Sequence, residues 1–347
     1  MLKNPEHIFL GSDQSPFLAP RGICVHNNCL LVSDTAQNRI FIWKNIPTTS
    51  YAEPDIILGN QEADVSEMNF KYPSGIWTNG DKLVVADAWN HRVLIWHKFP
   101  TTNHTLPDVV VGQLDFNSDL PNQLGVNNPP SSSSLYWPYG VYSDGVSLWI
   151  ADTGNRRILF YKNIPLHNGS SADEVIGQDN MESRDLNPNF STWPYSIKLD
   201  VNGGMIVTDT QYFRVLYWKS WKNAIKGEPN AIWGQQDLES NGQNRHYLKP
   251  TAYSLSWNYD ALIHEKHKLV FIADTGNSRI LSYPFDLNYG ESATTIYGQK
   301  DFDSIGENKE SIMGLDGHLY WPFSIAVDDE RLFVCETGNN RIFIYKI

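Results

Sequence analysis

The chain holds a small set of histidine, tyrosine, tryptophan and arginine side chains beside recurring prolines or inside recurring turns. Imidazole and phenol groups can donate or accept protons, so His91, Tyr139, Tyr195 and His318 are the candidates for acid–base catalysis. Aromatic rings stack on organic ligands, and guanidinium groups orient the polar ends of such ligands. The candidate ligand-binding residues are Arg21, Tyr72, Trp89, Trp137, Arg156, Trp193, Tyr212, Trp321 and Phe323.

A second set of charged residues repeats along the chain. In six segments an apolar run ends in an acid, and an arginine follows five residues later, as in Asp152 and Arg157. A catalytic group need not occur six times, so we interpret these pairs as structural groups that fix a tight turn. The acids are Asp34, Asp87, Asp152, Asp209, Asp274 and Glu336, and the arginines are Arg39, Arg92, Arg157, Arg214, Arg279 and Arg341.

Each acid–arginine segment belongs to a longer repeat of about 60 residues. A second apolar run follows the arginine, and a short run that ends in glycine follows that, as at Gly112 and Gly177. A proline also precedes the acid in every repeat. In the fifth repeat we take Pro250 as this proline, followed by an insertion of about ten residues. Each repeat therefore predicts four short strands separated by turn residues.

Four-stranded repeats of this length indicate an all-β fold, a six-bladed β-propeller with four-stranded antiparallel blades. The last repeat stops after its third strand, and residues 7–11 have the pattern of the missing fourth. We therefore expect the N-terminal strand to join the last blade and close the ring. Residues 1–347 are predicted to form a single propeller domain.

The hairpins also carry a family resemblance. The pattern D-x-x-N-x-R, as in Asp152 to Arg157, preceded by P-x-G-[IV], resembles the NHL repeat, and the likeness covers essentially the whole chain. It implies a six-bladed propeller. The departures are Gln37 and Tyr212 in place of the asparagine and Glu336 in place of the aspartate, and they affect only the geometry expected for individual hairpins.

In a propeller, the turn between the second and third strands and the link to the next blade emerge on the same face. The residues that flank the prolines are therefore expected to rim a central channel, with Lys249 and Thr251 in the fifth blade. Two longer links, at about residues 113–137 and 299–321, enter opposite blades and are predicted to cover the channel mouth.

These expectations lead to three functional hypotheses. The first is a binding propeller whose aromatic-lined central pocket takes an aromatic or amphipathic small molecule or peptide. The second is a metal-independent lyase, isomerase or cyclase that acts in the same pocket. The third is a protein–protein interaction scaffold, which the NHL resemblance implies. Whether the protein is an enzyme stays open at this point.

Charge, hydropathy and the positions of histidine and acidic residues disfavour several classes of partner. The formal net charge of −12 disfavours nucleic acid as a partner, and no apolar run is long enough to predict a membrane-spanning helix. The histidines do not occupy equivalent repeat positions, and the predicted inner strands carry acids only at the end far from the rim. We therefore expect no metal and no cofactor, and a monomeric protein.

Three cysteines are too few for a disulfide framework. Cys24 and Cys29 could face each other across one hairpin, so either a bridge or free thiols in a reducing cytoplasm is compatible with the sequence. The first residues lack the pattern of a signal peptide, which favours a cytoplasmic protein, although a mature secreted chain would look the same.

Overall fold

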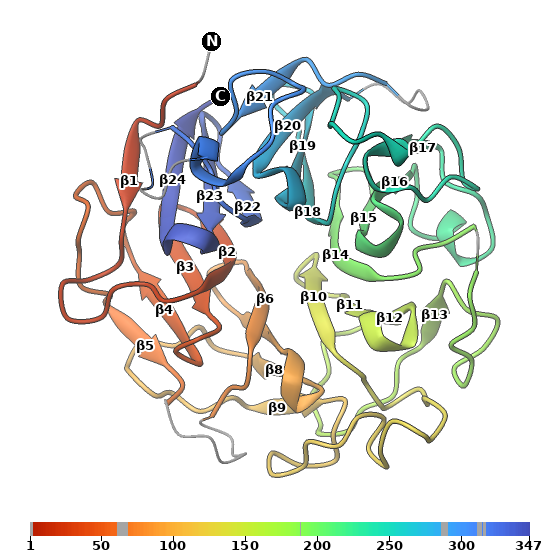
Figure 1. The fold of residues 1–347 in the computed structure, drawn as a ribbon. Coiled ribbons are helices and arrows are strands. Elements are labelled where there is room, and N and C mark those ends of the chain that lie inside the picture. The colour runs from red at the N-terminus through yellow and green to blue at the C-terminus, as the bar shows by residue number, and fades with distance from the viewer. Residues whose placement is uncertain (1–2, 61–68, 188, 286–290, 311–313, 315–316) are drawn as a thin grey trace. The chain divides into compact units, whose positions relative to one another are not determined.

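The computed structural model describes residues 3–60, 69–187, 189–285, 291–310, 314 and 317–347. Its strands form antiparallel sheets of four, and each sheet is one blade. The chain divides into two compact units. The N-terminal unit comprises Gly11–Pro47 and Tyr51–Leu186, and the C-terminal unit comprises Met1–Leu10, Thr48–Ser50 and Asn187–Ile347. Each unit holds three of the blades (Figure 1).

The N-terminal unit contains the first three blades, in which the strands pair in chain order. The first blade consists of β2 (Pro20–His26), β3 (Cys29–Asp34), β4 (Arg39–Trp43) and β5 (Ile56–Leu58). The second consists of β6 (Pro73–Thr78), β7 (Leu83–Asp87), β8 (Arg92–Trp96) and β9 (Val109–Val111). The third consists of β10 (Pro138–Ser143), β11 (Leu148–Asp152), β12 (Arg157–Tyr161) and β13 (Glu174–Ile176).

The C-terminal unit contains the other three blades. The fourth consists of β14 (Pro194–Leu199), β15 (Met205–Asp209), β16 (Arg214–Trp218) and β17 (Ala231–Trp233). The fifth consists of β18 (Asn258–His264), β19 (Leu269–Asp274), β20 (Arg279–Pro284) and β21 (Thr295–Tyr297). The sixth consists of β22 (Pro322–Val327), β23 (Arg331–Glu336), β24 (Arg341–Lys346) and β1 (His7–Phe9).

The sixth blade takes its outer strand from the beginning of the chain. β1 pairs antiparallel with β24, with His7 opposite Ile344 and Phe9 opposite Ile342 (Figure 1). The expected closure of the last blade by the N-terminal strand is thus confirmed. The six four-stranded antiparallel sheets also confirm the predicted fold class, a six-bladed β-propeller.

Short 3₁₀ turns join the second and third strands of five blades. They are η1 (Ala88–Asn90), η2 (Thr153–Asn155), η3 (Thr210–Tyr212), η6 (Thr275–Asn277) and η8 (Thr337–Asn339). A residue with left-handed backbone ends each turn, such as His91 at φ 52° and Arg156 at φ 56°. The remaining 3₁₀ segments, η4 (Asn223–Ile225), η5 (Gln243–His246) and η7 (Glu307–Glu310), lie in the links between strands.

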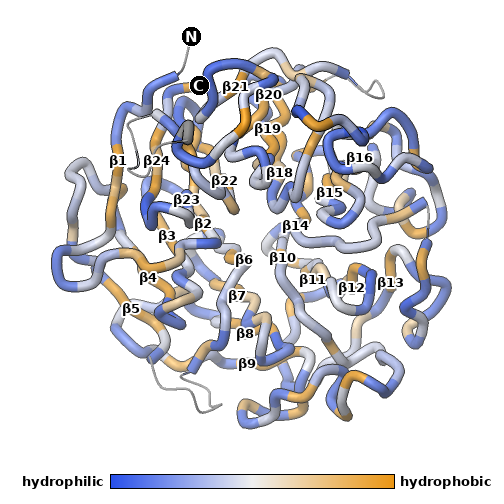
Figure 2. The backbone as a smooth tube through the Cα atoms, viewed as in Figure 1, coloured by the Kyte–Doolittle hydropathy of each residue, from blue (hydrophilic) through white to orange (hydrophobic). Residues whose placement is uncertain are grey.

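The apolar core lies between neighbouring blades. In the N-terminal unit one cluster joins the first two blades, as where Ile42 and Leu94 are both fully buried, and another joins the second and third. In the C-terminal unit the corresponding clusters join the fourth blade to the fifth and the fifth to the sixth. Along the chain, hydrophobic residues are common on the strands and hydrophilic residues on many of the links (Figure 2). Among the described residues, no helix has the length and hydropathy to cross a bilayer.

The repeated acid and arginine pair inside their own blade. Arg157 Nε lies 2.7 Å from Asp152 Oδ2, and both side chains are fully buried. Asp152 also accepts the N–H of Tyr136 at 2.7 Å, and Arg157 donates to the carbonyls of Ser131 and Ser134, so the pair ties the hairpin to the preceding link. Burial raises the pKa of Asp152, and the Arg157 guanidinium opposes that shift. Equivalent ion pairs join Asp87 to Arg92, Asp209 to Arg214, Asp274 to Arg279 and Glu336 to Arg341.

Candidate functional site

Apart from Trp89 and Tyr212, which lie in the 3₁₀ turns, the predicted aromatic residues occupy two positions at the start of the inner strands. Trp137 and Trp321 directly precede β10 and β22, whereas Tyr139, Tyr195 and Phe323 are the second residues of their strands. The preceding position has left-handed backbone in four blades, a conformation that bulky residues rarely adopt. Strain of this kind persists only where the surrounding structure fixes it. The four residues are Tyr72 (φ 59°), Trp137 (φ 51°), Trp257 (φ 48°) and Trp321 (φ 51°).

The fifth blade departs from the sequence prediction. Its inner strand begins at Asn258, which pairs with Asp274, so Asn258 takes the place of the proline and Pro250 lies outside the strands. Trp257 and Tyr259 therefore flank this position, and the assignment of Lys249 and Thr251 was wrong. The available signal was the aromatic spacing, because Trp257-Asn-Tyr259 matches Trp137-Pro-Tyr139.

In the N-terminal unit, four predicted residues form one cluster, which we call the aromatic cluster. The Tyr72 and Trp89 rings stack nearly parallel, with centroids 4.6 Å apart and 6° between their planes. The Arg21 guanidinium lies over the Tyr72 ring, 4.9 Å from the ring centroid. Tyr139 packs edge-on against Tyr72 at 6.0 Å, and its hydroxyl accepts a hydrogen bond from Trp89 Nε1 at 3.4 Å. Trp89 is 45% exposed, so this ordered surface is open to solvent.

His91 lies beneath the link that enters the third blade. Its Nδ1 accepts the backbone N–H of Trp137 at 3.1 Å, and its ring packs against Tyr136 at 5.4 Å and Trp137 at 6.4 Å. Burial, with a further contribution from the Lys71 charge, lowers the pKa of His91 to about 4. The imidazole is therefore neutral near pH 7 and positions the backbone of Trp137.

Arg156 also contacts a link. Its Nη1 donates to the carbonyl of Arg184 at 2.9 Å, and Arg184 Nη1 in turn donates to the carbonyl of Val126. These two hydrogen bonds connect the hairpin of the third blade with the links before and after it. The Arg156 side chain thus holds the backbone of the N-terminal unit in addition to any contact with a ligand.

In the C-terminal unit, the second residues of three adjacent inner strands pack together. Tyr195 contacts Tyr259 edge-on at 4.7 Å, and Tyr259 stacks on Phe323 at 4.4 Å with 22° between the planes. Tyr195 and Phe323 are buried, while Tyr259 is half-buried. The structure thus brings two predicted residues together through Tyr259, which sequence reasoning missed.

The carboxylate of Asp260 connects these same three strands. Asp260 pairs with Lys198 on β14 and accepts the Ser324 hydroxyl at 2.8 Å and the Ile325 N–H at 2.9 Å on β22. The expectation that inner-strand acids occur only at the far end was therefore wrong. Asp260 was missed because the fifth blade was aligned on Pro250. In the other blades its position holds glycine or serine, as at Gly140 and Ser324.

The remaining predicted residues lie apart in the C-terminal unit. The Trp193 N–H donates to Asp209, and Tyr212 lies under the Arg214 guanidinium at 5.0 Å. Trp321 is 43% exposed and packs on Tyr320 at 4.9 Å. The buried His318 offers its backbone carbonyl to Arg341 Nη2 at 3.1 Å. None of these contacts tests a role in ligand binding or catalysis, so those roles stay predictions.

Three links are long, not two. With β18 starting at Asn258, the link before the fifth blade is of similar length to the two predicted ones. All three share one design, in which an asparagine with left-handed backbone bonds the hairpin asparagine that follows. The pairs are Asn122 with Asn155, Asn244 with Asn277, and Asn308 with Asn339. The prediction that two links are longer than the rest was therefore wrong in its number, and the role of these links as covers stays a prediction.

No group of three or more histidine, cysteine, aspartate or glutamate side chains could hold a metal ion within the described ranges. The three cysteines are free thiols, which decides the alternative that the sequence left open for Cys24 and Cys29.

No family model matches the sequence, and no curated protein matches it. Solved structures do resemble the fold. A catalytically inactive variant of virginiamycin B lyase from Staphylococcus aureus, determined with quinupristin, is 11% identical, with a TM-score of 0.50 over 95% of each chain. The computationally designed Ika8 protein is 9% identical, with a TM-score of 0.47 over 98% of this chain and 100% of its own. The likeness to the lyase supports the propeller fold and no more.

Proposed function

We propose that this protein is an NHL-type propeller that binds an aromatic or amphipathic small molecule or peptide at the aromatic cluster of the N-terminal unit. The observation that carries the proposal is the exposed face of Trp89, held parallel to Tyr72 at 4.6 Å. A ring that is already ordered loses little conformational entropy when a ligand stacks on it. The hairpin ion pairs support the NHL assignment, because they give the repeated acid and arginine a structural role.

The charge near the cluster supports a ligand with a polar end. Arg21 lies against the Tyr72 ring and is half-buried, so its guanidinium is held at one side of the stack. A carboxylate, amide or hydroxyl on the ligand would meet this donor while an aromatic part stacks on Trp89. Lyase, isomerase or cyclase chemistry receives less support here, because His91 is neutral and its Nδ1 already accepts the Trp137 N–H.

The test is a binding measurement on the full-length protein. Calorimetric titration with N-acetyl-tryptophanamide and a set of aromatic acids should reveal saturable binding, and Trp89→Ala should weaken it by about tenfold. Tyr51→Ala is the matched control, since Tyr51 is also 45% exposed but does not belong to the cluster. Equal losses in the two variants, or no binding by any of these compounds, would count against the proposal.

A further inference from the structure

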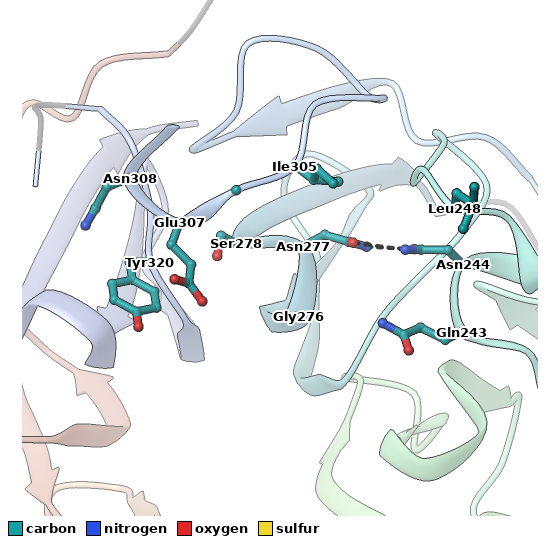
Figure 3. A pocket seen from close by; sticks show the side chains of 11 residues that line it. Gln243, Asn244, Leu248, Gly276, Asn277, Ser278, Ile305, Glu307, Asn308 and Tyr320 are labelled. Carbon is teal, nitrogen blue, oxygen red and sulfur yellow. Dashed lines mark hydrogen bonds between the residues drawn. The ribbon is translucent and has the colours of Figure 1, made fainter. Parts of the chain in front are cut away.

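The C-terminal unit has a concave surface that shares no residue with the aromatic cluster. It is a cleft of about 650 Å³, within the usual range for small-molecule sites. The link before β18, the hairpin between β19 and β20, and the link before β22 supply its walls (Figure 3).

The base of the cleft is held in place before any ligand arrives. Asn244 and Asn277 exchange hydrogen bonds of 3.1 and 2.8 Å between their side-chain amides. Ser254 also donates to Asn244, and Asn277 donates to Asp274, so both amides are anchored from below. A preformed site avoids the ordering cost that a flexible pair of links would incur on binding.

Two apolar side chains that line the cleft are exposed to solvent. Leu248 is 98% exposed and Ile305 is 45% exposed. Figure 3 shows Leu248 toward one end of the cleft and Ile305 between Leu248 and Glu307. A ligand with an apolar part could remove both side chains from water.

The opposite end of the cleft is acidic. Glu307 carries the only full charge among the lining residues, and its carboxylate is directed toward the Tyr320 side of the cleft (Figure 3). Burial and the neighbouring Glu307 charge raise the pKa of the Tyr320 phenol, so that hydroxyl keeps its proton. The net charge of −12 adds a general attraction for cations.

We propose that this cleft binds an amphipathic amine. The ammonium group pairs with Glu307, and the apolar part lies over Ile305 and Leu248. The cleft and the aromatic cluster share no residue, so this inference does not rest on the function proposed above.

The test compares three probes that share one apolar part and differ in charge. They are 4-phenylbutylamine, 4-phenylbutanol and 4-phenylbutyrate, titrated calorimetrically into the full-length protein. The amine should bind several-fold more tightly than the alcohol, and the carboxylate most weakly. Equal affinities for the three probes, or preference for the carboxylate, would overturn the proposal.

Two variants locate the binding. Glu307→Gln should remove the preference for amine over alcohol, a loss of about threefold to fivefold for an exposed pair. Leu248→Ser should weaken amine and alcohol alike. Glu228→Gln is the control, because it removes the same charge from an exposed residue that does not line the cleft. If Glu228→Gln lowers amine affinity as much as Glu307→Gln does, the attraction belongs to the whole protein and the assigned site is wrong.

Discussion

In the first blade, the side-chain amide of Gln37 lies 3.0 Å from Oδ2 of Asp34. In the third blade, the Arg157 Nε donates to the equivalent oxygen of Asp152. Asp34 also accepts the N–H groups of Leu18 at 2.7 Å and Ala36 at 3.1 Å. The glutamine thus replaces the arginine as a partner of the acid, and no ion pair joins Asp34 to Arg39 in the described part of the chain.

This difference predicts unequal roles for two arginines at the same repeat position. Arg157→Ala should lower the free energy of unfolding by about 3–5 kcal/mol, because it leaves the Asp152 carboxylate buried without its partner. Arg39→Ala should cost about 1 kcal/mol or less. Urea denaturation of both variants measures the difference, and similar losses would show that Gln37 does not substitute for the arginine.

The histidine beneath Trp137 predicts a dependence of stability on pH. The pKa of His91 is lowered to about 4 in the folded protein, so the unfolded chain binds a proton more readily between about pH 4 and 6.5. Stability should therefore fall as the pH drops through this window, by up to about 3 kcal/mol from this group. His91→Asn tolerates the left-handed backbone, retains a hydrogen-bond acceptor and should flatten the profile.

Chemical denaturation at a series of pH values checks that expectation. His167→Asn serves as the reference, because His167 is exposed and its replacement should leave the profile unchanged. An unaltered profile in His91→Asn would mean that other groups cause the acid sensitivity.

The left-handed backbone before β18 predicts an unusual ranking of substitutions. Trp257 has a φ of 48°, so the Trp257→Gly variant should be more stable than Trp257→Ala by about 1 kcal/mol, because alanine retains a β-carbon that is strained in this conformation. Trp193 occupies the equivalent place in the fourth blade and is not left-handed, so alanine should be the more stable replacement there. Thermal unfolding of the four variants tests the ranking, and the same order at both sites would contradict it.

The ionic contact between inner strands predicts an energetic coupling. Asp260 is nearly buried and Lys198 is about one-third exposed. Asp260→Asn leaves the ammonium partly solvated, while Lys198→Met leaves the carboxylate with Ser324 and backbone donors. A double-mutant cycle on the free energy of unfolding should give a coupling of about 1–2 kcal/mol. If the two substitutions have additive effects, the ion pair does not stabilise the fold and the prediction is wrong.

The repeat made the blades predictable from the sequence. Strand spacing and the acid–arginine pairs depend on local patterns, so six occurrences reinforce one another, and the closure by β1 follows from the incomplete last repeat. The pairing of Asp152 with Arg157 could be foreseen because both lie on one hairpin.

The site was less predictable, because its contacts join different blades. Arg21, Tyr72 and Tyr139 come from the starts of the first three inner strands. The stacking of Tyr72 on Trp89 also depends on the left-handed backbone of Tyr72 and on the turn after β7 in the same blade, which no short motif encodes. The start of the inner strand in the fifth blade was predicted wrongly for a different reason. Asn258 stands where the other repeats have a proline, so the prediction was based on Pro250 and not on the aromatic spacing around Trp257.

The pairing of His7 with Ile344 has a consequence for biosynthesis. β1 precedes β24 by several hundred residues, so the sixth blade stays incomplete until β24 has been synthesised. Until then β1 is an unsatisfied edge that another polypeptide could pair with. A circular permutant that starts after Phe9 and appends residues 1–9 behind β24 would let this blade form from one contiguous stretch, and should shorten the period in which the nascent chain depends on chaperones.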